Sequence, residues 1–486
     1  MARMKKSIKH NLKEVKHTPA RSIKVKYSDE PVTSFGGIAL VDKLAMRLGF
    51  WTILKKLLPE RSGDFSWMDI IRSAIGGLLS GSRGSITCEE VREDKTLQKL
   101  LSVAGAPSES TFWRALESLG SEKINDLMGR CLREWNRKIL DRISTSKLSY
   151  HGFIPMFGDG TLLEGSRRRE GTKFIPEKGN GLMLSTWFIG PFLLFQKLAG
   201  NGSGEVSGLR EGLKDVLKDV VDPLKFRERL LVLLDSLHGD SPTCTRLEAN
   251  SLKYIIGANK LTETDRLLKE RADFEWVELD ARPDLDWGEC AVCVCKIQCA
   301  DWSESRMLIG RRWRKKGDLP GMYNYSGVLT NLTKDDVSDL QKKGSNFAEV
   351  IWKLYDGKAG MENYYKDFLE DLSGHHPPCQ ELNRNRGYYS LLAFAYTLSR
   401  GVDLLGGWGD SDLAASQRRG SIIRQDGKSR KRARPKLMRL WRLRRRYFSL
   451  PGRVTRHAGT VFVQLLGVGK KIQHEFEACF RRLSRC

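Results

Sequence analysis

Three acidic residues occupy positions from which a fold could gather them around one cleft. Asp159 follows the apolar run FIPMFG, Asp235 follows the run LLVLL, and Glu362 lies within the stretch LYDGKAGMENYYKDFLEDL. Carboxylates that share a cleft repel one another unless a cation binds among them. They therefore favour two-metal phosphoryl transfer, in which carboxylates hold two Mg²⁺ or Mn²⁺ ions beside the attacking and leaving oxygens.

Each acid taken singly also has a plainer interpretation, because helix caps and surface salt bridges use the same side chains. Around Glu362, the spacing of Lys358 and Lys366 would place all three side chains on one helix face, with Tyr355 close to the same stripe. That pattern is typical of an intrahelical salt bridge. Only the conjunction of three acids favours metal chemistry.

The elements that must position the first two acids alternate between strand and helix patterns. Strands are predicted for HGFIPMFGDGTLLEG, for GLMLSTWFIG and PFLLFQKLAG as a hairpin, for RERLLVLLDSLHG and for KYIIGAN, and helices for GLREGLKDVLKDVV and TCTRLEANSL. This order predicts an α/β fold. Asp159 and Asp235 then lie at the carboxyl ends of strands, where substrates reach an open sheet.

The rest of the chain divides by composition. We predict a basic leader, a helical DNA-binding region, an α/β core in two parts, a β-rich insertion between those parts, and a basic C-terminal region. Their bounds, in the order of the chain, are 1–34 for the leader, 35–150 for the helical region, 151–272 for the first core part, 273–345 for the insertion, 346–410 for the second core part and 411–486 for the basic region.

The net charge of +24 points to a polyanionic partner, because clustered Lys and Arg release counterions from nucleic-acid phosphates. Arg114, in PSESTFWRALESLG, fits a helix-turn-helix recognition helix and equally an ordinary capped helix. Arg444 and Arg445 fit phosphate contacts or a solvated charged tail. The sequence predicts no membrane span and no signal peptide, so we expect a cytoplasmic, nucleoid-associated protein.

The ten cysteines are mostly scattered, which favours reduced thiols over a disulfide framework. The exception is CAVCVCKIQC, in which Cys290, Cys293, Cys295 and Cys299 could be drawn as a zinc site. A strand pattern in the same residues argues against it, since a strand points neighbouring side chains to opposite faces.

Together these motifs resemble the DDE transposases of bacterial insertion sequences, in the cut-and-paste group with a Tyr-Arg-Glu-Lys signature and nearest to its group 1 DDE-domain members. FGDGT resembles the first-Asp motif, LLVLLDSLHG the second, and the series Tyr355, Lys358, Glu362 and Lys366 the signature. APSESTFWRAL, NRNRGYYSLLAFAYTL and RRRYFSLPGRVTRH resemble further family elements. The resemblance implies an RNase H-like catalytic core interrupted by the insertion.

The resemblance also implies roles. Asp159, Asp235 and Glu362 become the ligands of two Mg²⁺ or Mn²⁺ ions, and Tyr355 and the two signature lysines hold phosphates beside the cleaved bond. The partners are double-stranded DNA, both the terminal inverted repeats and the target, and a second copy of the chain in a synaptic dimer. A DNA hairpin is the expected intermediate.

Three points depart from the family pattern or stay open. Lys358 replaces the usual Arg and so loses a bidentate phosphate fork, and Leu369 stands where a second signature Lys often lies. In relatives a Trp of the insertion stacks on a flipped base, for which Trp302 and Trp313 are both candidates. An inactive transposase-derived DNA-binding protein and a metal-dependent nuclease without strand transfer remain the alternatives.

Overall fold

The computed structural model describes residues 30–175, 179–199, 205–258, 261–279, 287–300, 302–341, 346–408 and 437–486. Most of the predicted basic leader and the first part of the basic C-terminal region lie outside these residues. The chain divides into two units, Met1–Pro31 and Val32–Cys486, and all the elements named below belong to the second. Within the described ranges no helix is long and apolar enough to cross a bilayer.

Helices occupy the region that precedes the sheet. Ser66 starts one of them with a capping box, in which the Asp69 N–H donates to Ser66 Oγ at 3.2 Å and the Ser66 N–H donates to Asp69 Oδ2 at 3.1 Å. Asp94 caps another by accepting from the Leu97 N–H at 2.7 Å. The elements are η1 (Gly36–Ile38), α2 (Ala39–Arg47), α3 (Phe50–Leu57), α4 (Trp67–Ser80), η2 (Gly84–Cys88), α5 (Glu89–Glu93), α6 (Lys95–Leu101), α7 (Glu109–Leu119), α8 (Glu122–Leu140) and α9 (Thr145–Leu148).

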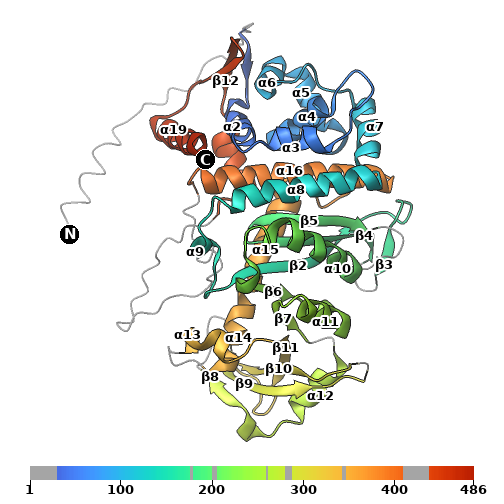
Figure 1. Ribbon diagram of the computed structural model, residues 1–486, viewed down its shortest axis with the longest axis vertical. Coiled ribbons are helices and arrows are strands. Elements are labelled where there is room, and N and C mark those ends of the chain that lie inside the picture. Colours follow the sequence, from blue (N-terminus) through green and yellow to red (C-terminus); the bar gives the residue numbers. More distant parts are fainter. Residues whose placement is uncertain are drawn as a thin grey trace, which may run out of the picture. The chain divides into compact units, whose positions relative to one another are not determined.

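One long helix, α16 (Leu382–Leu405), joins this helical layer to the sheet. It is buried on all sides for most of its length and contacts α2, α4, α7 and α8 as well as strand β5 (Phe192–Ala199) (Figure 1). A Cβ added to Gly120 would lie 1.6 Å from the carbonyl oxygen of Asn383. Only glycine therefore allows the end of α7 to touch α16.

The core sheet is mixed. Its strand order is β3-β4-β2-β6-β7-β11-β10-β9-β8, with β5 paired to β4. Strands β2 (Ile154–Glu164), β6 (Leu230–Leu234) and β7 (Lys253–Gly257) are parallel, while β3 (Lys173–Ile175), β4 (Gly179–Ile189) and β5 run antiparallel. The helical segments between them are α10 (Glu205–Val216), η3 (Leu217–Val221), η4 (Arg227–Arg229), η5 (Ser236–His238) and α11 (Ser241–Ala249). The predicted α/β class is confirmed at this level.

The β-rich stretch after α12 (Thr262–Lys269) and η6 (Asp273–Glu275) adds to the same sheet. It contains β8 (Val277–Leu279), β9 (Trp287–Ile297), β10 (Arg306–Lys315) and β11 (Asn324–Thr330). β11 pairs antiparallel with β7, with Val328 opposite Gly257. These strands thus cover the edge that β7 would otherwise expose, rather than forming a separate sheet.

After the sheet the chain returns through short helical segments to the long helix. They are η8 (Asp335–Val337), α13 (Ser338–Gln341), α14 (Phe347–Asp356), η9 (Gly357–Gly360), α15 (Met361–Tyr365) and the π-helix η10 (Lys366–Asp371). The final elements are α18 (Leu440–Leu443), η11 (Arg444–Phe448), β12 (Gly452–His457), β13 (Thr460–Leu465) and α19 (Lys470–Arg485). β12 and β13 form a three-stranded sheet with β1 (Val32–Thr33).

Candidate active site

Asp159 and Asp235 lie on neighbouring parallel strands. Asp235 directly follows β6, as predicted, but Asp159 lies within β2, which continues to Glu164 and pairs Asp159 with Thr186 of β4. The predicted strand-end position of Asp159 is therefore wrong. β2 and β6 are parallel and in register up to the pair Phe157 and Leu233, and each acid stands two residues beyond its member of that pair. Asp235 is still extended, with φ −80° and ψ −179°, so the register continues to it. Because neighbouring strands lie about 4.8 Å apart, the two carboxylates enter the same small volume. Both residues are half-buried.

Main-chain N–H groups hold both carboxylates. The Gly160 N–H donates to Asp159 Oδ1 at 2.9 Å, and the Leu237 N–H donates to Asp235 Oδ1 at 3.1 Å, which makes Asp235 the N-cap of η5. These hydrogen bonds orient both side chains.

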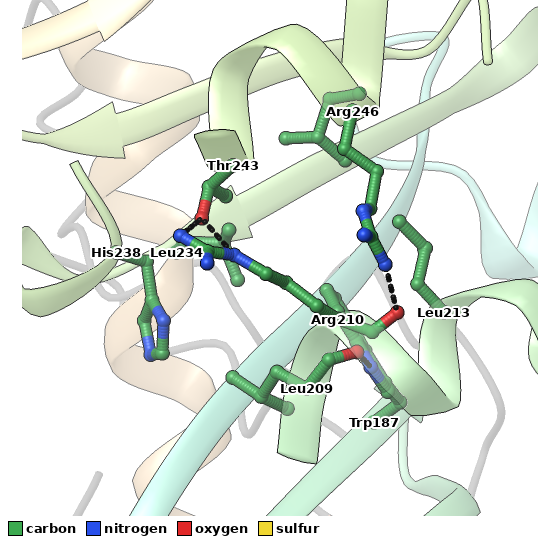
Figure 2. A pocket seen from close by; sticks show the side chains of 9 residues that line it. Trp187, Leu209, Arg210, Leu213, Leu234, His238, Thr243 and Arg246 are labelled. Carbon is green, nitrogen blue, oxygen red and sulfur yellow. Dashed lines mark hydrogen bonds between the residues drawn. The ribbon is translucent and has the colours of Figure 1, made fainter. Parts of the chain in front are cut away.

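His238 backs the second acid. Its Nε2 lies 3.5 Å from Asp235 Oδ1, and its side chain is 1% exposed while that of Asp235 is 38% exposed. The ring lines a narrow pocket with Trp187 and Leu234, in which Arg210 donates to Thr243 Oγ1 (Figure 2). The imidazole thus meets Asp235 from the inside of the protein. His238 was not among the predicted site residues, although its position three residues after Asp235 could have indicated it.

Tyr355 links the strand ends to α14. Burial, then the negative charge of Asp235 and, more weakly, that of Asp159, raise the pKa of the Tyr355 hydroxyl, while Arg311 opposes the shift. A Cβ added to Gly257, at the end of β7, would lie 2.9 Å from Tyr355 Oη. Gly257 therefore leaves room for the phenol beside both acids. The structure brings three of the predicted site residues together at this point.

Glu362 belongs to α15, and its side chain lies outside the described residues. The main chain of this turn is placed by Tyr365, three residues later, whose hydroxyl donates to the Asp159 carbonyl oxygen at 3.1 Å. Among the described side chains no three acids, thiols or imidazoles gather closely enough to hold a metal ion. The three-acid site stays a prediction, and its helix turn lies next to Asp159.

The helix that carries the signature residues differs from the expected one. Lys358 lies half-buried in the 3-10 turn η9, and Lys366 is exposed as the first residue of the π-helix η10. The expectation that Lys358, Glu362 and Lys366 share a stripe assumes the same rotation at every residue. Three different helix types follow one another between residues 357 and 371. These residues therefore do not form the single regular helix that the predicted stripe requires.

The two candidate tryptophans have different surroundings. Trp302 is 5% exposed and its ring covers the Arg306 guanidinium at 5.1 Å. Trp313 is half-buried and stacks on Trp287 with ring centroids 5.1 Å apart. Trp302 thus has little free face for a base, which favours Trp313.

Arg311 connects the Trp313 stack to the helix of Tyr355. Its guanidinium lies 3.7 Å from the centre of the Trp352 ring and 5.8 Å from that of Trp313, and it pairs with Asp356 at 3.3 Å. A guanidinium between aromatic faces is a stable arrangement. The sequence analysis did not single out this arginine, because nothing in its spacing sets it apart.

The basic residues predicted to contact DNA also differ in exposure. Arg114 on α7 and Arg445 in η11 are exposed. Arg444 donates to the carbonyl oxygens of Leu79 at 3.0 Å and Asp371 at 2.9 Å, and burial lowers its pKa. Its guanidinium therefore holds η11 against α4 and η10, and this engagement does not support the predicted DNA contact for Arg444.

The cysteines do not form the alternative zinc site. Cys293 and Cys295 lie on one face of β9, Cys290 on the other, and all ten cysteines of the chain, which lie within the described ranges, are free thiols. Burial raises the pKa of several of them, Cys88 and Cys131 among them. A buried neutral thiol behaves as a small apolar side chain.

Comparison of the sequence with models of protein families and with curated proteins finds no match. Among solved structures, the chain is similar to a piggyBac transposase in a synaptic complex with hairpin DNA. The two chains are 11% identical with a TM-score of 0.37, and the match covers 87% of this chain and 82% of that one. A likeness at this level carries no argument about fold or function.

Proposed function

We propose that this chain is a DDE-type DNA transposase with an RNase H-like core, which cuts an insertion sequence out of DNA and joins it to a target. The observation that carries the proposal is the parallel register of β2 and β6, which runs up to Phe157 and Leu233 and supports placing Asp159 beside Asp235, two residues further on each chain. The Tyr355 hydroxyl lies near both acids, and the turn of Glu362 is tied to Asp159. The family motifs in the sequence coincide with these positions.

Asp159 and Asp235 fit a divalent cation. Their carboxylates, oriented by main-chain N–H groups, supply the hard oxygen donors that Mg²⁺ and Mn²⁺ prefer, and after burial their charges raise the pKa of Tyr355. Asp159, Asp235 and Glu362 would hold the ions. Bound there, the two cations would supply charge stabilisation for the attacking and leaving oxygens of an in-line displacement.

The other residues bind and orient DNA in this proposal. Lys358, Lys366 and the hydroxyl of Tyr355 contact phosphates beside the scissile bond, and Trp313 offers a ring face to a flipped base. The helical region with Arg114, together with Arg445, binds the terminal inverted repeats, and two copies of the chain bring the two ends together. The C-terminal basic region adds phosphate contacts.

The proposed reaction is a series of displacements at phosphorus. Water cuts one strand, and the freed 3′-hydroxyl attacks the opposite strand to form a hairpin. The hairpin is reopened, and the 3′-hydroxyl then attacks target DNA. Each step transfers a phosphodiester between oxygens, so a serine or tyrosine nucleophile on the protein is not required.

The test is cleavage of a labelled DNA that carries the ends of the encoding element, with Mg²⁺, by the wild type and by Glu362→Gln. Cutting by the wild type alone, with hairpin-sized products, is expected. Cutting of these ends with no joining of pre-cut ends to a target would favour a nuclease. Tight binding of the ends without cutting would favour an inactive DNA-binding derivative.

A further inference from the structure

The hydroxyl of Tyr365 closes a small buried cluster at the first acid. It donates to the Asp159 carbonyl oxygen at 3.1 Å and contacts Thr186 Oγ1, which itself lies 3.4 Å from the same carbonyl oxygen. Thr186 is fully buried and Tyr365 is 9% exposed. A buried phenol requires a hydrogen-bond partner, and here that partner is the main chain of a proposed metal ligand.

The cluster lies where β2 leaves its parallel neighbour. β2 and β6 are paired only up to Phe157 and Leu233, after which the chain of β6 turns into η5. The Asp159 carbonyl, two residues further on, is bonded by side-chain hydroxyls from β4 and α15 instead. A half-buried main-chain carbonyl needs such a hydrogen-bond partner.

The ring of Tyr365 is held as firmly as its hydroxyl. Phe188 of β4 packs on it with ring centroids 5.6 Å apart and an interplanar angle of 58°. Phe188 also contacts Tyr364 and Tyr396, so the aromatic layer extends from α15 to α16. Phe188 therefore supports the ring from the side of β4, while the hydroxyl bonds it to the Asp159 carbonyl.

The same turn of helix is fixed on its other side. Tyr365 ends α15, and the next residues form the π-helix η10, whose Asp367 pairs with Arg400 of α16 at 2.5 Å. Single π turns inside helices recur at functional sites, because they shift the phase of the following side chains. The main chain of Glu362 belongs to the same five-residue helix as Tyr365.

We propose that Tyr365 is a positioning residue that sets the distance between the helix turn of Glu362 and the strand of Asp159. This inference rests on the proposed function, because the two acids matter together only if they share cations. Removing the hydroxyl while keeping the ring leaves the packing intact and releases the turn. The affinity for a divalent cation then falls, since its ligands are no longer held in place.

The test compares Tyr365→Phe with a matched control, Tyr396→Phe. Tyr396 is also a buried tyrosine whose hydroxyl donates to a main-chain carbonyl, that of Pro191 at 2.9 Å, and it lies outside the proposed site. Mn²⁺ affinity is measured on the free protein by the loss of the free-ion paramagnetic resonance signal. Hydrogen exchange of residues 361–365 is measured on the same samples.

Tyr365→Phe is expected to weaken Mn²⁺ binding about tenfold, as for other residues that orient metal ligands, and to speed exchange in residues 361–365. Tyr396→Phe should leave both unchanged. Equal Mn²⁺ affinity and equal exchange in Tyr365→Phe and the wild type would overturn the inference. If Tyr365→Phe does not fold, Thr186→Val removes the second hydroxyl of the cluster, and the same two readouts decide.

Failure of the proposed function gives a different result. A wild type that binds no Mn²⁺ removes the metal from the proposal but leaves the exchange comparison intact. Faster exchange in Tyr365→Phe alone would then still support the positioning of the turn, whereas equal exchange would overturn it. The two failures are therefore distinguishable.

Discussion

Two groups of carboxylates in this protein are built in opposite ways. The β2–β6 pair, Asp159 and Asp235, is half-buried and held by main-chain N–H groups. The buried carboxylate cluster, Asp367, Asp371 and Asp403, is 9% exposed or less and is closed by arginines. The positive charges that balance this cluster are arginine side chains of the same chain.

The arginines of the cluster join segments that are far apart in the sequence. Arg400, with no exposed surface, pairs with Asp367 at 2.5 Å and with Asp403 at 3.0 Å. Arg439 pairs with Asp367 at 2.8 Å and with Asp371 at 2.6 Å. The cluster therefore fastens the C-terminal segment to η10 and α16. Acids that serve the fold are thus paired with arginines inside it, whereas the β2–β6 pair is held by main-chain N–H groups at half-buried positions.

The largest effect is expected from neutralising one acid of the β2–β6 pair. Asp235→Asn should slow cleavage of the element's ends by about a thousandfold or more, because a lost metal ligand removes several kcal/mol of transition-state stabilisation. Thermal unfolding should change little. Asp240→Asn is the control: it removes the nearby charge that pairs with Arg210 and caps α11, and cleavage should stay within severalfold of the wild type. Rapid cleavage by Asp235→Asn would break the comparison.

The next effect concerns the buried carboxylate cluster. Arg400→Met should lower the free energy of unfolding by about 3–5 kcal/mol, because it leaves buried carboxylates without their cation. Urea titration followed by circular dichroism measures this. The exposed Arg114→Met should change the same quantity by no more than about 0.5 kcal/mol. A loss below about 1 kcal/mol for Arg400→Met would mean that the cluster does not fasten the fold.

The two tryptophans differ in the same way: Trp302 packs inside the protein, whereas Trp313 is proposed to bind a ligand. Trp302→Ala should cost about 3 kcal/mol of stability, since it empties a buried site that packs on Arg306. Trp313→Ala should leave stability nearly unchanged and reduce hairpin formation about tenfold, the value of one lost base stack. Product analysis on labelled ends, alongside thermal unfolding, measures both. If Trp302→Ala reduced hairpin formation and Trp313→Ala reduced stability, the base contact would be assigned to Trp302.

The last prediction is a pH dependence of stability. Burial, together with the hydrogen bond and charge of Asp371, raises the pKa of Asp367 from 3.8 to about 7 against the opposing charge of Arg400. The folded state then holds a proton that the unfolded chain has released above pH 3.8. The stabilisation of the folded state by this bound proton is complete below pH 3.8 and is lost as the pH rises through about 7.

Stability should therefore fall between pH 4 and pH 7 by at most about 1.4 kcal/mol per pH unit from this group. Asp367→Asn should flatten that slope, even though it also weakens the pair with Arg400. Unfolding free energies of both proteins at pH 5 and pH 8 give the comparison. An equal pH slope in the two proteins would assign the titration to another group.

Much of the strand arrangement follows from local patterns. The fully apolar run before Asp235 is typical of a central parallel strand, and such strands place the acids that follow them at one edge. The change of helix type around Glu362 was not predictable in this way, because residue spacing does not distinguish 3-10, α and π turns. Their choice depends on tertiary contacts such as that of Tyr365 with Asp159.

Side-chain surroundings were the least predictable part of the site. Trp302 and Trp313 stand in similar β-rich sequence, and only the pairing of β9 with β10 places Trp313 in the half-buried stack on Trp287. Arg444 stands in an arginine run that suggests DNA, yet its guanidinium is occupied by main-chain carbonyls of α4 and η10. Tyr365 could be identified only once the fold set it beside Asp159.

The central claim is that Asp159, Asp235 and Glu362 surround one cation site. It is tested most directly by loading the protein with Fe²⁺ in place of Mg²⁺ and adding ascorbate and peroxide, which cut the main chain next to the bound ion. The account predicts fragments that end near residues 159, 235 and 362, suppressed by excess Mg²⁺ and absent from Asp235→Asn. Cuts confined to other parts of the chain, or cuts that persist in Asp235→Asn, would contradict it.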